Sequence, residues 1–163
     1  MNMHDYLAKI DEILRNDVDL WKLLYHKSTH FDDDPLKKEN ILELPPKEMF
    51  DIVNLRLKHT PVTKDLADIE INRIIFYPAP RRPQSQNYMV ATQEINFDIF
   101  CHRDFNDVDM RLAKICDRVN EIFSNKHITG MGKVAFVDGR PFTLIEQGYI
   151  GYTLTYAFGS GNV

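Results

Sequence analysis

Two histidines and three carboxylates lie close together in the first quarter of the sequence. His26 and His30 are four residues apart, and an acidic triplet at 32–34 follows directly. Two histidines at this spacing plus a carboxylate can form a zinc site. Here, however, His26 lies at the end of a predicted helix and His30 in the polar segment after it, so the two are not on one helical face. There is also no HExxH motif to orient a water molecule. The triplet also lacks the alternating ligands and the glycine of a calcium loop. We therefore expect a solvated linker and no metal site.

The sequence also contains no recognisable motif for nucleophilic or acid–base catalysis. Cys101 and His102 are adjacent, but neighbouring side chains of a strand point to opposite faces, so this pair should not meet. No serine stands in a GxSxG motif, and no glycines form a GxxxxGK[ST] phosphate loop. We therefore expect a protein that is not an enzyme and that has no cofactor. The carboxylates of the later helix are expected to form a solvated face: Asp107, Asp109, Asp117 and Glu121.

The stretch 79–87, APRRPQSQN, separates two predicted strands with more residues than a tight turn needs. Its prolines stiffen the chain and withhold backbone donors, which suits an extended arm that projects without aggregating. Arg81 and Arg82 can each pair with a carboxylate of a neighbouring chain through two hydrogen bonds. Gln84 and Gln86 are adaptable hydrogen-bonding groups. We predict an arm that contacts another subunit or ring, and a plain long hairpin loop remains the alternative.

Tyrosines extend this predicted contact surface. Tyrosine combines an apolar ring with a polar hydroxyl and therefore suits half-wet interfaces. We add four such residues to the candidates, one beside the arm and three in the last strand: Tyr88, Tyr149, Tyr152 and Tyr156.

The composition is that of an ordinary globular protein. The 163 residues are 44% hydrophobic and 27% charged, enough for one α+β domain over 1–163 with a real core. We expect a mainly helical part over 1–60, and a sheet with one long helix over 61–163. A net charge of −4 gives the chain no general attraction to nucleic acid or anionic lipid.

The chain also lacks the signals of membrane insertion or export. No apolar run approaches the roughly 20 residues that a membrane span needs. The N-terminal residues lack the basic region and apolar core of a signal peptide. We therefore expect a cytoplasmic location, in which Cys101 and Cys116 are structural thiols rather than a disulfide.

Hydrophobic periodicity predicts the helices. Apolar residues at steps of three and four predict a helix over 5–27 with a break at 16–19, where an aspartate can cap the second part. After an irregular segment over 28–46, a short helix should span 47–59, with Pro45 and Pro46 in its first turn and one apolar side. That side is expected to consist of Met49, Phe50, Val53 and Leu57.

One more helix and the strands complete the prediction. One uninterrupted helix should begin near residue 104 and end before 125–127. Its stripe is expected to consist of Val108, Leu112, Ile115, Val119 and Ile122.

Alternating or continuous apolar patterns predict strands at 69–77, 88–102, 133–137, 140–146 and 149–158. Asp138-Gly139 should form a hairpin turn. This order favours a largely antiparallel sheet with helices packed on one face, and with the N-terminal helices preceding the sheet.

Five segments together resemble a known family. They are DEILRNDVDLWKLLY, INFDIFCH, DVDMRLAKICDRVNEIF, ITGMGKVAFVDG and GYIGYTLTYAFG, and they span nearly the whole chain. In element order and pattern, the sequence resembles the neck and tail-completion proteins of tailed bacteriophages, most closely the tail terminators and head–tail joining proteins. The resemblance implies an α+β fold and a ring, typically hexameric, that caps the tail tube and docks to the head connector.

The resemblance also implies partners and a location. The partners would be further copies of the chain, the tail tube protein and the head–tail connector proteins, with genomic DNA passing through the lumen unbound. The protein would be part of the virion, assembled in the cytoplasm of the bacterial host. Three alternatives stay open: an adaptor or stopper elsewhere in the neck, a small enzyme or ligand-binding domain, and a nucleic-acid-binding module.

Overall fold

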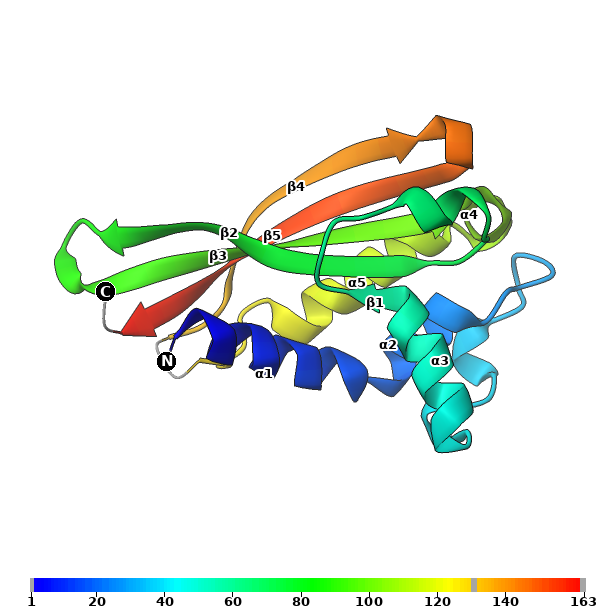
Figure 1. Ribbon diagram of the computed structural model, residues 1–163, viewed down its shortest axis with the longest axis horizontal. Helices are drawn as coiled ribbons and strands as arrows, with labels where there is room; N and C mark the ends of the chain where they lie inside the picture. Colours follow the sequence, from blue (N-terminus) through cyan, green and yellow to red (C-terminus); the bar gives the residue numbers. More distant parts are fainter. Residues whose placement is uncertain (1, 130–131, 162–163) are drawn as a thin grey trace.

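The computed structural model describes residues 2–129 and 132–161, with the backbone alone at 87, 88, 160 and 161 (Figure 1). The chain begins with helices α1 (Met3–Arg15) and α2 (Val18–Tyr25). Asn2 and Asp5 form a capping box at the start of α1. Asp17 caps α2 by accepting a hydrogen bond from the Leu20 amide at 2.8 Å. The predicted break at 16–19 is thus confirmed.

The next segment is built from short helical turns and one further helix. Two 3₁₀ turns, η1 (Pro35–Lys37) and η2 (Ile41–Glu43), interrupt the irregular stretch. Helix α3 (Pro46–Arg56) begins with a proline at its first position, as predicted, but ends three residues early. The prediction for Phe50 was wrong, because its side chain is 52% exposed and does not face the core.

Five strands form one sheet in the order β1-β2-β3-β5-β4. The short β1 (Leu57–Lys58) pairs parallel to β2 (Arg73–Gln84), after the 3₁₀ turn η3 (Lys64–Ala67). Every other pairing is antiparallel, through β3 (Asn87–His102), β5 (Tyr149–Gly161) and β4 (Ala135–Leu144). The predicted α+β fold class is therefore confirmed.

One face of the sheet packs on the helices and forms the main core (Figure 1). The predicted alternation holds, because Ile95, Phe97 and Ile99 are fully buried while Glu94 and Asn96 lie on the other face, half-exposed. Helices α1, α2 and α5 cover this face with residues that share a helical period. They include Tyr6, Ile10, Leu14, Trp21, Ile115, Val119 and Phe123.

A smaller apolar cluster covers part of the opposite face. The segment before β2 folds over the sheet there, with Leu66 and Ile71 against Phe100 and Tyr149. The Tyr149 hydroxyl donates to the Ile69 carbonyl at 2.6 Å and accepts from the Ile71 amide at 3.2 Å. This segment is why β2 begins at Arg73 rather than at the predicted residue 69.

The predicted single long helix is in fact two. Helix α4 (Arg103–Asp109) and helix α5 (Arg111–Phe123) meet at Met110, which has a left-handed backbone with φ of 54°. At this break the side chains of Asp109 and Arg111 are both 0% exposed and form an ion pair at 3.0 Å. The prediction that Asp109 belongs to a solvated face was therefore wrong.

Arg111 also binds α2 and the segment that follows it. Its guanidinium donates to the Leu23 carbonyl at 2.8 Å, to the His26 carbonyl, and to the Ser28 hydroxyl at 3.0 Å. These carbonyls have no partner within their own helix, because they lie at or beyond its last turn. One buried side chain thus joins the α4–α5 break to the end of α2.

The prediction of a hairpin turn at Asp138-Gly139 was also wrong. These residues lie inside β4, where the pairing with β5 shifts by one residue between Phe136 and Asp138. The shift is a bulge rather than a turn. The predicted strands at 133–137 and 140–146 are accordingly parts of one strand. The turn at Gly148, with φ of 77°, is present as expected.

Replacing Arg111 should destabilise the fold strongly. Arg111→Met removes the buried arginine from Asp109, whose carboxylate then keeps Lys114 at 3.5 Å, and it removes the donor to the carbonyls of α2. We expect these losses to cost about 3–5 kcal/mol. Urea unfolding of this variant measures the loss, and Arg140→Met is the matched control. Because Arg140 is 82% exposed, its pair with Asp138 should contribute at most about 1 kcal/mol.

A double variant keeps this prediction testable if Arg111→Met does not fold. Asp109→Leu with Arg111→Met removes both charges and should recover part of the loss. A loss below about 1 kcal/mol for Arg111→Met alone would contradict the role given to the pair.

Candidate functional site

The stretch 79–87 is the outer part of a long β-hairpin (Figure 1). Strands β2 and β3 stay paired out to Gln84 and Asn87, so the predicted loop shrinks to a turn at residues 85 and 86. In Figure 1 this part projects beyond α1 at one end of the sheet. We call residues 79–86 and the paired start of β3 the arm.

The prolines of the arm have a structural explanation. Strand β1 pairs with β2 only at Ile74 and Ile75, so β2 is an edge strand from Phe76 outward. Proline is tolerated on an edge because no neighbouring strand needs its missing amide. The pairing shifts between Pro78 and Arg81, and there the buried Gln93 side chain donates to the Ala79 carbonyl at 2.9 Å.

The predicted contact residues of the arm differ in their exposure to solvent. Arg82, Gln84 and Gln86 are exposed, and Arg81 is half-buried. Tyr88 lies in β3, but its side chain is outside the described residues. The use of the arm as a contact remains a prediction.

The three tyrosines of the last strand do not lie together on one exposed surface. Tyr149 and Tyr156 are 1% and 0% exposed, so they are core residues of this chain. The Tyr156 hydroxyl donates to Asn120 at 3.0 Å, and burial raises its pKa. Tyr152 remains half-exposed beside β4.

Strand β4 offers a second surface that the sequence did not indicate. It is the last strand in the sheet order, so its outer edge pairs with no strand in the described part of the chain. Most of its residues are exposed, and among them Phe136 and Val137 are 51% and 45% exposed. An edge strand with exposed apolar residues is a template for pairing with another chain.

A groove lies between β4 and α5 on the helical side of the sheet. It has a volume of about 550 Å³ and an apolar floor that includes Leu112, Cys116 and Leu154. Phe136 and Tyr152 form its wall on the strand side. Asp117 lies on the helix side and is exposed.

The Asp117 carboxylate has no hydrogen bond or ion pair in the residues that the structure describes. The cations of α5 are used elsewhere. Arg111 and Lys114 pair with Asp109 at 3.0 and 3.5 Å, and Arg118 binds Asp17 at 2.6 Å. An open carboxylate beside an apolar floor gives the groove a negative edge.

The other face of the sheet carries a polar hollow of about 630 Å³ between the arm and β4. Its lining includes the charged side chains of Arg82, Glu94, Asp138 and Arg140. Its threonines are held within the sheet, since Thr153 donates to Asp98 at 2.6 Å. Arg82 and Asp117 therefore lie at hollows on opposite faces of the sheet.

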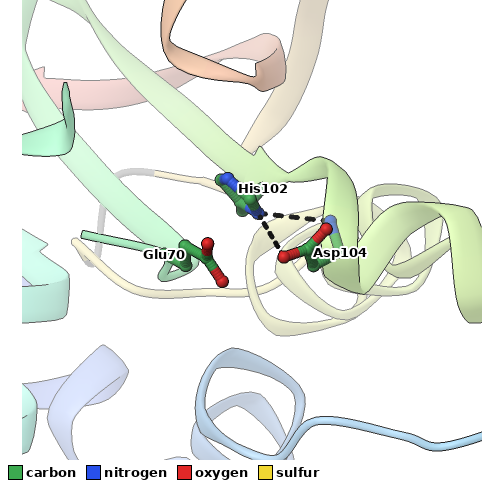
Figure 2. Close-up of side chains that lie close together, drawn as sticks. All are labelled: Glu70, His102 and Asp104. Carbon is green, nitrogen blue, oxygen red and sulfur yellow. Dashed lines mark hydrogen bonds and ion pairs between the residues drawn. The ribbon is translucent and has the colours of Figure 1, made fainter. Parts of the chain in front are cut away.

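A mixed cluster of Glu70, His102 and Asp104 is the group of described residues that could hold a metal ion (Figure 2). One ligand atom from each lies within 4.8 Å of the others. Sequence reasoning missed this group because Glu70 reaches it from the segment before β2, while the other two residues begin α4. No motif links positions so far apart.

The hydrogen bonding of the cluster favours helix capping over metal binding. The backbone amide of Asp104 donates to His102 Nδ1 at 3.2 Å, so this nitrogen serves as the cap acceptor at the start of α4. A metal at Nδ1 would have to displace this bond. Lys27 and Arg103 approach the Asp104 carboxylate at 3.8 Å, and Glu70 and His102 help to lower the pKa of Asp104.

Both cysteines are free thiols, as predicted. Burial raises the pKa of Cys101 and of Cys116 to about 12. Nucleophilic chemistry needs the thiolate, which such a pKa suppresses near neutral pH.

Comparison with known protein families gives a match over most of the chain. The model of the YomW family matches residues 17–158, from the cap of α2 into the last strand. The chain belongs to the YomW family. One relative, described as an SPbeta prophage-derived uncharacterized protein YomW of Bacillus subtilis (strain 168), is 30% identical over 166 residues. The match covers 96% of this chain and 96% of the relative, so a phage origin is supported.

Membrane-spanning helices are absent from the described residues of this YomW-family chain. No helix within 2–129 or 132–161 is both long and apolar enough to cross a membrane.

The capping role of His102 gives a testable order of stabilities in this YomW-family protein. His102→Ala removes the acceptor at the start of α4, whereas asparagine is a strong cap. We expect His102→Asn to be more stable than His102→Ala by about 1 kcal/mol in urea unfolding. The reverse order would contradict the capping role. A rise in melting temperature with Zn²⁺ that Glu70→Gln abolishes would instead show a metal site.

Proposed function

We propose that this YomW-family protein is a structural virion protein of a tailed phage, without enzymatic activity. In this proposal it is a tail terminator, which forms a ring that caps the tail tube and joins it to the head connector. The ring leaves a channel through which the genome passes.

The exposed edge of β4 beside the apolar groove is the observation that carries this proposal. Exposed apolar residues next to a concave apolar floor are typical of surfaces that another chain covers. Phe136 and Val137 stand at this edge, and Phe136 also lines the groove. A chain that works alone gains nothing from leaving such an edge open to aggregation.

The separation of the arm from the groove supports a ring. The arm projects at one end of the sheet (Figure 1). The groove lies on the helical side of the sheet, between α5 and β4. Contacts between two different surfaces of identical subunits are heterologous, and they close into a ring when the rotation fits.

Charge and origin also agree with the proposal. A net charge of −4 is compatible with a channel for DNA, because each phosphate that the lumen neutralised would increase its affinity for DNA and slow the passage of the genome. The YomW relative in Bacillus subtilis derives from a prophage, and the match leaves no large part of either chain uncovered.

Induction of a lysogen that lacks this gene tests the proposal. Loss of a terminator should give overlong or ragged tails without heads. Loss of an adaptor or stopper should instead give tails of normal length beside full or leaking heads. Adding the purified protein to the mutant lysate should restore joined particles. Normal virions without the chain would overturn the structural role.

A further inference from the structure

We propose that the arm of one copy docks in the groove between α5 and β4 of the next copy, with Arg82 of the arm facing Asp117 of the groove. This inference rests on the proposed ring and names the contact that would build it.

The groove needs an occupant of particular chemistry. Its floor is apolar, with Leu112, Cys116 and Leu154, and its volume of about 550 Å³ suits a few side chains. Asp117 is exposed at its edge and makes no ion pair or hydrogen bond among the described residues. The fitting partner is therefore a narrow, partly apolar segment that carries a cation.

The arm has this chemistry. The Arg82 side chain is exposed and, in the part of the chain that the structure describes, makes no ion pair or hydrogen bond. Pro83 follows it, and the nearby Met89 on the paired strand is 55% exposed. A planar guanidinium binds a carboxylate through two parallel hydrogen bonds. The arm and the groove are thus complementary in both polarity and charge.

The arm is also prepared for docking. Strand pairing and prolines hold it in one conformation before any partner is present. A preordered segment loses little conformational entropy on binding, so more of the contact energy contributes to affinity.

The same chain cannot make this contact with itself. Arg82 lines the polar hollow on one face of the sheet, whereas Asp117 lines the groove on the other. The pair must therefore join two copies. Each copy then offers one arm and one groove, and repetition of this contact gives a closed ring or an open helix.

Charge reversal tests the contact directly. Native mass is measured for the natural chain, for Arg82→Glu, for Asp117→Arg and for the double variant, all at one concentration. Circular dichroism confirms that each variant is folded. We expect each single reversal to weaken assembly at least about tenfold, because like charges then meet, and we expect the double variant to recover it.

Mixing the two single variants sharpens the test. In an equal mixture, the two variants can alternate around a ring with an even number of copies. Every contact then joins opposite charges, so the mixture should assemble although neither variant does so alone. Lys47→Glu and Asp51→Arg, which reverse exposed charges on α3, outside the arm and the groove, should leave assembly unchanged.

The outcomes separate this inference from the proposed function. If the natural chain forms rings that both single reversals leave intact, the proposed contact between Arg82 and Asp117 is wrong, while the proposed ring is supported. If the singles fail and neither the double variant nor the mixture recovers, the pairing of Arg82 with Asp117 is wrong. If the natural chain neither assembles nor binds purified phage tails, both proposals fall.

Discussion

The buried guanidinium of Arg111 is the interaction on which the arrangement of the helices depends. It neutralises Asp109 and binds carbonyls at the end of α2, so the break between α4 and α5 is fixed against the first helices. A buried pair of this kind contributes little net stability relative to apolar residues, yet it fixes one geometry because each partner is costly alone. The position of α5 that follows is what forms one side of the groove beside β4.

Periodicity was enough to predict the elements whose burial repeats regularly. The helix break before α2 and the alternation of β3 both follow from local patterns, namely the cap at Asp17 and the apolar residues at every second position. The burial of Asp109 could not be predicted in this way. Its carboxylate is buried because an arginine two residues later meets carbonyls from the N-terminal helices, and a sequence does not show that meeting.

The candidate surfaces were predictable only in part, and for a similar reason. The prolines of 79–87 indicated a projecting segment, but not that it continues a strand, because strand continuation depends on the partner β3. Asp138-Gly139 has the chemistry of a turn, yet pairing with β5 makes it a bulge inside β4. Asp117 was placed correctly on a solvated face, while its place beside an apolar groove follows from the packing of α5 next to β5 and β4.

An arm at one end of the sheet and a groove on its helical side form a pair of unlike surfaces, the arrangement that head-to-tail assembly requires. Hydrogen–deuterium exchange of the chain, dilute and assembled, tests this central claim most directly. We expect assembly to slow amide exchange on two separate surfaces, the arm at 79–86 and the groove at 112–124 and 135–144. Slower exchange on one of these surfaces without the other, or on neither, would contradict head-to-tail assembly.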